Sequence, residues 1–255
     1  MPSPPPIVVF AALEWECSTV LRGLDGVRRA PAESVARWSG AAGGRPVWVV
    51  RTGVGVERAV AATAAAPADA ALVVSTGCAG GLDPTLRPGD LVVASAIIDP
   101  VGDTLPADPQ HAATALRQAQ EAGLRAGSGA VRCSASVLAD VAAKRAAAAG
   151  GAVAVEMEGA PIARWAAASG LPFVSVRAVL DGAGEALDIP AGCVDAATGR
   201  VRPLALAAHL ATHPRQLSRL VALHRMQQAA RTALERFFAA WLGGGTCDLL
   251  QRRGR

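Results

Sequence analysis

Short apolar segments alternate along this chain with segments of helical periodicity, and this alternation constrains the fold more than any other feature. The apolar segments have the length of buried strands, and they span residues 7–12, 47–51, 71–75, 91–98, 152–155 and 172–180. The helical segments lie between them, at residues 13–24, 57–65, 112–122, 137–149 and 161–169. Strands that alternate with helices predict an α/β fold of three layers, in which a mixed and mostly parallel sheet is flanked by helices.

A single domain is expected over residues 7–241, because 255 residues fit one large α/β domain and no linker or internal repeat divides them. From Pro203 onward the chain shows only helical periodicity, which ends at Gly243-Gly244-Gly245. Residues 1–6, a short proline-rich leader, and residues 246–255 are predicted to be flexible termini.

The composition and the cysteines narrow the classes of function. The formal net charge is +4 and aromatic residues make up 4% of the chain, with no tyrosine, so a nucleic-acid partner is not expected. Five dispersed cysteines without CxxC spacing, and four histidines that complete no zinc pattern, predict no metal site and a reducing, cytoplasmic location. No apolar run of membrane length is free of charge and glycine, and the leader lacks the basic region of a signal peptide.

Two glycine-rich segments follow predicted strands. Gly53-Val54-Gly55 lies between a strand and a helix, where backbone N–H groups can receive an anion or a polar ligand. It is not a dinucleotide fingerprint, which would need a third glycine at Arg58. Thr76-Gly77-Cys78-Ala79-Gly80-Gly81 is denser in glycine and is predicted to be a turn that a ligand can approach closely. A tight turn with a purely structural role is an equal alternative for the first segment and is less favoured for the second.

Four carboxylates stand beside apolar segments, where an unpartnered charge is costly. Asp181 follows the last apolar strand, and open α/β sheets bind their ligands at the carboxyl ends of strands. Glu156 and Glu158 are two residues apart, so on a strand they would point to the same face. Glu16 lies in the opening turn of the first helix. The structural alternatives are a helix N-terminal acid for Glu16 and a capping acid for one member of the glutamate pair.

The order of these segments resembles the nucleoside phosphorylase superfamily over roughly residues 7 to 190. The resemblance is carried by Ala12-Leu13-Glu14-Trp15-Glu16, Thr52-Gly53-Val54-Gly55, Ser75-Thr76-Gly77-Cys78-Ala79-Gly80-Gly81, Gly89-Asp90-Leu91-Val92-Val93, Val155-Glu156-Met157-Glu158-Gly159-Ala160 and Val176-Arg177-Ala178-Val179-Leu180-Asp181. Within the superfamily the chain is most similar to the methylthioadenosine/S-adenosylhomocysteine nucleosidases. Its helical tail, with Pro203 and His213-Pro214, resembles the hopanoid-associated phosphorylase subgroup.

The resemblance implies the phosphorylase/hydrolase-like fold and cleavage of the N-glycosidic bond of a 5′-modified adenosine, by hydrolysis or phosphorolysis. Adenosylhopane, a lipid-linked nucleoside, is a candidate substrate. The resemblance implies that Asp181 protonates or hydrogen-bonds N7 of the leaving purine and that Glu16 positions or deprotonates the attacking water. It implies that Glu158 holds the ribose hydroxyls, with Met157 packed on the sugar and Glu156 in support.

Further residues of the site follow from the same resemblance. Gly77, Cys78 and Ala79 are expected to line the ribose and nucleophile side, and Val137 is expected to contact the base. A helix that begins at Ser136 and continues with core residues is the structural alternative for the base contact. The resemblance implies no cofactor other than phosphate as a co-substrate, and a homodimer or homotrimer.

Two positions depart from the pattern of the superfamily. Ser75 stands at the end of the third predicted strand, where the phosphorylases carry an arginine that binds phosphate. This difference favours water as the nucleophile, although Arg51, just before Gly53, is a candidate for the phosphate side. Leu180 stands where the nucleosidases have a serine, and it cannot hydrogen-bond Asp181.

Two alternatives stay open. Ser75 and Leu180 motivate a non-catalytic nucleoside-binding protein that kept the fold. The C-terminal helix is expected to pack on the sheet or on a second subunit, and the alternative is that it receives a lipid tail or contacts a membrane surface. Its apolar residues are Leu217, Leu220, Val221, Leu234, Phe237, Phe238 and Trp241.

Overall fold

The computed structural model describes residues 4–31, 35–187, 192–193, 195, 202, 212–213 and 216–244, and these residues form the predicted mixed α/β fold. The strands are β1 (Ile7–Ala11), β2 (Asp25–Arg29), β3 (Arg37–Ala42), β4 (Arg45–Arg51), β5 (Leu72–Gly81), β6 (Leu91–Ile98), β7 (Thr104–Pro106), β8 (Ala126–Cys133), β9 (Ala152–Glu156) and β10 (Phe173–Asp181). The helices are α1 (Glu14–Leu21), α2 (Val56–Thr63), α3 (Pro109–Glu121), α4 (Val141–Ala148), α5 (Gly159–Ala168) and α7 (Leu217–Gly243).

The N-terminal leader is partly attached to the body of the molecule. The carbonyl of Pro5 accepts a hydrogen bond from Arg45 Nη1 at 2.9 Å, and the carbonyl of Pro6 accepts one from Ala71 N at 2.8 Å. Residues 1–3, the segment around Pro203 and residues 246–255 lie outside the described residues, so the predictions made for them stay predictions.

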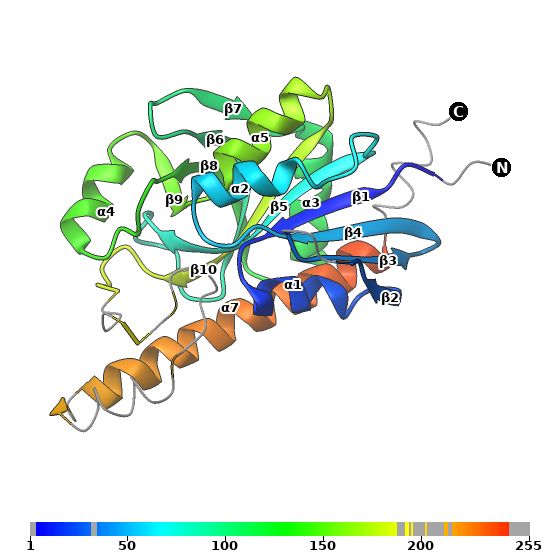
Figure 1. Cartoon of the computed structure of the whole chain (residues 1–255). Coiled ribbons are helices and arrows are strands. Elements are labelled where there is room, and N and C mark those ends of the chain that lie inside the picture. Colours follow the sequence, from blue (N-terminus) through cyan, green and yellow to red (C-terminus); the bar gives the residue numbers. More distant parts are fainter. Residues whose placement is uncertain are drawn as a thin grey trace.

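The sheet is mixed, and part of it closes on itself. Because β5 pairs with both β9 and β10, the strands β5, β10, β6, β8 and β9 form a closed ring. From β5 the sheet continues through β1, β4 and β3 to the exposed strand β2. The strands β4, β1, β5 and β10 are parallel, so their carboxyl ends meet at one edge of the sheet (Figure 1).

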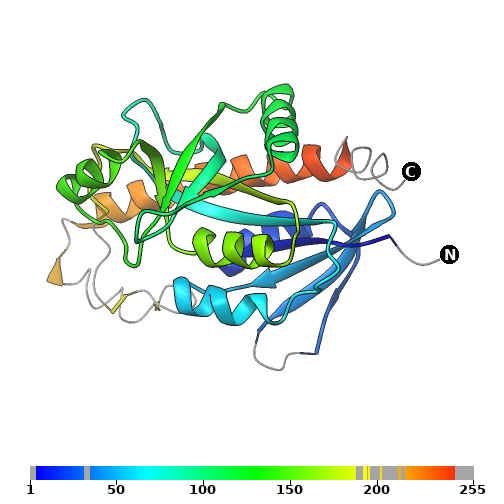
Figure 2. The same ribbon diagram turned by 90° about the horizontal axis from the view of Figure 1, so that it is seen from above.

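Helices cover both faces of the sheet, and the alternating side chains of β1 belong to two different cores. Ile7, Val9 and Ala11 pack in a core with residues of α1, α3 and α7. Val8 and Phe10 pack in a second core with residues of α2 and α5. Figure 1 shows α1 and α7 below the sheet and α2 and α5 above it, and Figure 2 shows α2 and α5 from their own side. Burial from both sides explains the continuous apolar run of this strand.

Helix α7 has a buried half and an exposed half. In the C-terminal half the buried residues recur every three or four positions, at Ala230, Ala233, Leu234, Phe237, Phe238, Trp241 and Leu242. They pack with residues of α1, α3 and β10, and the rings of Phe237 and Trp241 stack with their centroids 5.8 Å apart. The N-terminal half leaves Leu217 and Val221 exposed and extends past the sheet (Figure 1). The C-terminal half of this helix therefore packs on the sheet as predicted, and the N-terminal half does not.

The glycine-rich segment Thr76–Gly81 is the second half of β5 and not the predicted turn. It pairs with β10 on one side and with β9 on the other. Hydrogen bonds to two neighbouring strands hold this segment extended although its composition disfavours a strand.

Four strands and one helix boundary also differ from the prediction. The strands β2, β3, β7 and β8 were not predicted, because none of them has a long apolar run; β2 is exposed at every position. In β8 a Cβ on Gly129 would lie 2.6 Å from Val153 Cγ2, so close packing favours glycine there, whereas a Cβ on Gly127 would meet nothing within 4 Å. Helix α4 begins at Val141 after the capping residue Asp140, and not at Val137.

We expect Phe237→Ala to lower the free energy of unfolding by about 3 to 5 kcal/mol, because it empties a fully buried ring position between α7 and the sheet. Val221→Ala, on the exposed half of the same helix, should change it by less than about 1 kcal/mol. Chemical denaturation of the two variants measures the difference. Equal losses would contradict the assignment of the C-terminal half alone to the core.

Candidate functional site

The candidate site lies where the carboxyl ends of the central parallel strands meet. The register places Ala11, the last residue of β1, beside Arg51 of β4 and Thr76 of β5. On the other side of β5, Arg177 of β10 pairs with Gly77. Side chains that are distant in the sequence but follow these strand ends therefore come together at one edge of the sheet.

Glu16 is buried there and is held by three backbone N–H groups. Its Oε2 accepts hydrogen bonds from Ala12 N at 3.0 Å and from Leu13 N at 2.9 Å, and its Oε1 accepts one from Cys78 N at 2.8 Å. Burial raises the pKa of Glu16, while the N–H groups and Arg177 oppose that rise. The bond from Leu13 also makes Glu16 the capping acid of α1, so it combines the structural role considered from the sequence with a place in the site.

Gly77 lets β5 approach the Glu16 carboxylate closely. Its φ is +144°, and a Cβ at this position would lie 2.8 Å from Glu16 Oε1, so no other residue fits without a shift. Burial, together with the neighbouring Glu16, raises the pKa of the Cys78 thiol well above its usual range, which keeps the thiol neutral and unsuited to act as a nucleophile. Ala79 is buried in the core under α2 and α5.

A buried ion pair joins Glu156, at the end of β9, to Arg177 of β10. Arg177 Nη2 donates to Glu156 Oε2 at 2.7 Å and to Ser75 Oγ at 2.6 Å, and each side chain of the pair is 1% exposed. Glu156 Oε2 also accepts from Glu158 N at 2.8 Å and from Gly159 N at 2.7 Å, so the capping role at α5 belongs to Glu156. Ser75 lies within β5 and not at its end, because the strand continues to Gly81.

Glu158 reaches a different part of the site. β9 ends at Glu156, so the two glutamates do not share a strand face as the sequence analysis predicts. Glu158 Oε1 accepts a hydrogen bond at 2.7 Å from Gly55 N, in the turn that leads into α2. Burial and the negative charge of Glu156 raise the pKa of Glu158 to about 8, against the opposing effect of Arg177. This carboxyl group therefore holds a proton at neutral pH in the free protein.

Asp181 ends β10 and is also buried. Its Oδ2 accepts a hydrogen bond from the Nζ of Lys144, a buried lysine of α4, and the two groups form an ion pair. Burial raises the pKa of Asp181, and the ammonium group of Lys144 opposes this rise without cancelling it. The strand ends thus carry three buried carboxyl groups whose affinity for a proton is increased.

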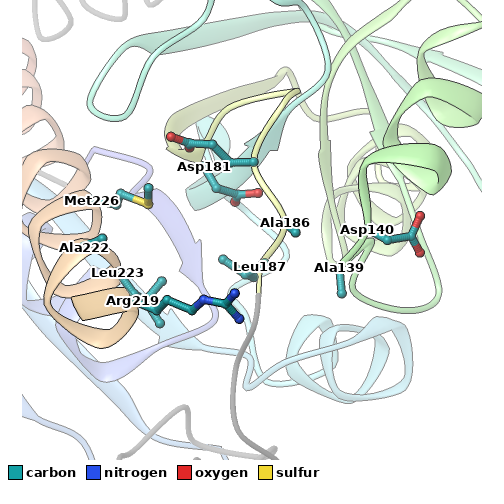
Figure 3. A pocket seen from close by; sticks show the side chains of 10 residues that line it. Ala139, Asp140, Asp181, Ala186, Leu187, Arg219, Ala222, Leu223 and Met226 are labelled. Carbon is teal, nitrogen blue, oxygen red and sulfur yellow. The ribbon is translucent and has the colours of Figure 1, made fainter. Parts of the chain in front are cut away.

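A cavity of about 560 Å³ opens beside Asp181 (Figure 3). The loop after β10, the residues just before α4 and the N-terminal half of α7 line it. From α7, Ala222, Leu223 and Met226 form an apolar wall, and Arg219 brings a positive charge to the same side. The exposed half of α7 therefore borders a cavity that reaches a candidate site residue.

The remaining predicted residues lie around this cluster. Arg51 forms an ion pair with Glu14 at 3.9 Å, and Gly53 has a φ of +76°, which favours glycine in the turn. Met157 is partly buried in the turn between β9 and α5. Val137 is 53% exposed in the segment before α4, so the structure does not bring it into the buried cluster.

Two buried cations of the site were not predicted from the sequence as site residues. Arg177 lies within the apolar strand β10, and Lys144 lies within an alanine-rich helix. A charged residue inside such a segment is itself a signal, because a buried cation needs a partner. The partners are distant in the chain and follow only from the fold.

Comparisons with known protein sequences find a family and a relative. A family model described as the phosphorylase superfamily matches residues 6–208. A 5′-methylthioadenosine/S-adenosylhomocysteine nucleosidase of Glaesserella parasuis is 36% identical over 129 residues, which are 43% of this chain and 56% of the relative, so the match spans about half the length of that protein.

Solved structures share the fold. The 5′-methylthioadenosine/S-adenosylhomocysteine nucleosidase of Neisseria meningitidis, in complex with methylthio-immucillin-A, has a TM-score of 0.73 at 20% identity, over 93% of this chain and 98% of that one. The native futalosine hydrolase of Helicobacter pylori has a TM-score of 0.68 at 18% identity, over 91% of this chain and 97% of that one. These likenesses confirm the predicted fold class.

We expect Glu158→Gln to make the protein more stable at alkaline pH. Glu158 has an ordinary pKa of 4.5 and a folded-state pKa of about 8, so between these values the folded state binds one more proton than the unfolded state and stability falls as pH rises. A shift of this size corresponds to at most about 5 kcal/mol above pH 8, a loss that the neutral amide avoids.

Urea denaturation at pH 6 and pH 9 measures this effect, with Glu57→Gln, an exposed carboxylate of α2, as the control. If stability fell between pH 6 and pH 9 as steeply in Glu158→Gln as in the wild type, the raised pKa would belong to another group.

Proposed function

Because this chain belongs to the phosphorylase superfamily, we propose that it is an enzyme that cleaves the N-glycosidic bond of a 5′-modified adenosine nucleoside and releases adenine. One observation carries the proposal: the buried carboxyl groups of Glu16, Glu158 and Asp181 come after β1, β9 and β10, three strands that all pair with β5. Each of these groups is costly to bury, and a binding scaffold without activity would not need all three. The nucleosidase relative from Glaesserella parasuis supports the class of substrate.

Asp181 protonates the leaving base. Adenine is a poor leaving group as an anion, so its departure needs a proton at N7 from a positioned acid. Burial raises the pKa of Asp181, which favours the protonated form that can donate. Asp181 also lines the cavity, where a bound base can reach it.

Glu158 and Met157 hold the ribose. Glu158 Oε1 accepts a hydrogen bond from Gly55 N, and its Oε2, which has no hydrogen-bond partner among the described residues, forms hydrogen bonds with the ribose hydroxyls. Cleavage passes through a state with positive charge on the sugar, which nearby carboxylates stabilise. Glu156 supports this arrangement, because it accepts hydrogen bonds from the backbone N–H groups at the start of α5 and so fixes the position of Glu158.

Water is the nucleophile, and Glu16 accepts its proton. A phosphate ion needs a cation that is free to bind it. Arg177, the buried cation beside Glu156, already donates through Nη2 to Glu156 and Ser75. Hydrolysis by this arrangement uses no resident cofactor, and phosphate enters only in the alternative reaction.

The 5′ substituent is apolar, and adenosylhopane is the candidate that the hopanoid-associated subgroup suggests. The apolar wall formed by Ala222, Leu223 and Met226 supports this proposal, because it borders a cavity large enough for part of an aliphatic group. The exposed Leu217 and Val221 of α7 continue this apolar surface outward, where a lipid chain, a membrane surface or a second subunit can cover them.

The enzyme acts in the cytoplasm as a homodimer or homotrimer. Cys17, Cys78, Cys133 and Cys193 are free, which suits a reducing compartment. Within the described part of the chain, none of the helices has the length and hydrophobicity needed to cross a bilayer.

With 5′-methylthioadenosine as the substrate, the wild-type protein should release adenine and a free reducing sugar in the absence of phosphate. Asp181→Asn should lower kcat by about 10²- to 10⁴-fold, because the amide cannot donate the proton of a carboxylic acid to N7. Chromatography of adenine and mass spectrometry of the sugar measure both results, and Asp69→Asn, at an exposed position, is the control.

Three outcomes separate the alternatives. A sugar 1-phosphate formed only with phosphate would show phosphorolysis and overturn the assignment of water. Binding of the nucleoside without release of adenine, unchanged in Asp181→Asn, would favour the non-catalytic alternative. Adenine release that Asp181→Asn leaves at the wild-type rate would assign the acid to another residue.

We expect Leu223→Asp to discriminate between substrates. A charge in the apolar wall should lower kcat/KM for an adenosine with a long 5′-alkyl chain by at least about tenfold, since each buried methylene contributes about 0.8 kcal/mol, and should leave 5′-methylthioadenosine nearly unchanged. Gln228→Asp, at an exposed position of the same helix that does not line the cavity, should affect neither substrate. Equal loss for both substrates would remove this cavity as the place of the 5′ group.

A further inference from the structure

We propose that Lys144 is a positioning residue for the acid Asp181, which it holds by one carboxylate oxygen so that the other oxygen is presented to the leaving base. The inference rests on the proposed function, since Lys144 acts through Asp181, the proposed acid. It concerns a lysine that the sequence analysis did not single out.

The contacts of Lys144 show that it serves the protein and not a ligand. Its side chain is 1% exposed. Its Nζ donates to Asp181 Oδ2, to the carbonyl of Gly182 at 2.7 Å and to the carbonyl of Glu185 at 2.8 Å. An ammonium group has three N–H donors, and these three acceptors use all of them. Lys144 is therefore not available to bind phosphate or the substrate directly.

The two carboxylate oxygens of Asp181 have different surroundings. Oδ2 is held by Lys144, whereas Oδ1 has no hydrogen-bond partner in the part of the chain that the structure describes. Asp181 lines the cavity beside α7, so its unpartnered oxygen belongs to a side chain that a ligand can reach (Figure 3). A proton shared with N7 of a purine needs one oxygen of this kind, fixed in direction.

Lys144 also fixes the loop that follows Asp181. Gly182 N donates to Glu185 Oε2 at 2.7 Å and Glu185 N donates to the carbonyl of Gly182 at 3.1 Å, so residues 182–185 form a compact turn. Lys144 ties both ends of this turn to α4. Glu185 and Leu187 of the same loop line the cavity, so one side chain organises the acid and the adjoining wall.

This arrangement answers a question raised by the sequence. Leu180 offers Asp181 no hydrogen-bond donor from its own strand. The structure supplies the donor from α4, a helix that lies far from β10 in sequence. The orientation of Asp181 therefore depends on a tertiary contact and not on its neighbour in the chain.

The charge of Lys144 makes the arrangement testable through pH. The charged groups around Asp181 are Lys144 of α4, Asp140 just before α4, Glu185 of the loop and Arg219 of α7. Burial raises the pKa of Asp181, the Lys144 cation opposes the rise and Glu185 adds to it. Removal of the Lys144 charge should therefore move the deprotonation of Asp181 to higher pH.

The experiment compares pH profiles of adenine release by the wild type, Lys144→Met, Lys144→Arg and Arg145→Met. In Lys144→Met, kcat at neutral pH should fall about 10- to 100-fold with a smaller change in KM, because the acid is misdirected but the sugar site is intact. The limb on which activity is lost with rising pH should shift upward by about one unit or more. Lys144→Arg, which keeps the charge, should lose activity at the same pH as the wild type. Arg145→Met, at an exposed position of the same helix, should show the wild-type kcat and pH profile.

The outcomes are distinct. An unshifted limb in Lys144→Met, or an equal shift in Arg145→Met, would overturn the inference and leave the proposed function standing. A wild type that releases no adenine from any nucleoside would overturn both. If Lys144→Met does not fold, Lys144→Gln, whose amide can still donate to a loop carbonyl but carries no charge, makes the same test with the same expected shift.

Discussion

The buried ion pair between Arg177 and Glu156 is the interaction on which the site depends. It lies between β10 and β9, two strands of the closed ring, and the guanidinium also donates to Ser75 of β5 and to Ser175 of β10. Glu156 Oε1 has no hydrogen-bond partner among the described residues, so Arg177 is the main compensation for this buried charge. Removing one partner of such a pair costs about 3 to 5 kcal/mol. Glu156 also accepts hydrogen bonds from Glu158 N and Gly159 N, at the start of α5. The pair therefore fixes the position of Glu158 between β9 and α5.

The carboxyl groups of the site owe their properties to the same cause. Burial raises the pKa of Glu16, Glu158 and Asp181, and the differences among them come from their partners. Glu16 is surrounded by backbone N–H groups, Glu158 lies beside another glutamate, and Asp181 lies beside a lysine. The affinity of each carboxyl group for a proton is thus set by its surroundings and not by its residue type alone. Such tuning lowers stability, since every one of these groups would be better solvated in the unfolded chain.

Helix α7 connects the stability of the fold to the site. Its C-terminal half contributes Phe237, Phe238 and Trp241 to the core, and this packing holds the helix in place. Its N-terminal half carries Leu223 and Met226 to the cavity beside Asp181. The buried half therefore positions the half that borders the cavity.

The elements that the sequence predicted are those whose evidence is local. The apolar runs of β1, β6, β9 and β10 appear within one or two residues of their predicted bounds, because a strand buried on both faces must be apolar throughout. The polar edge strand β2 and the glycine-rich β8 were missed, and the second half of β5 was taken for a turn, because pairing with distant strands holds these segments extended.

The alternation of strands and helices and the carboxylates beside the apolar segments are visible in the sequence, and the resemblance indicates the family. The partners of these carboxylates follow only from the fold: Lys144 for Asp181, Gly55 for Glu158, and Arg177 for Glu156. The physical reason is that these hydrogen bonds join residues far apart in the chain. They depend on which strands are neighbours and in what register, and no local pattern of residues encodes that choice.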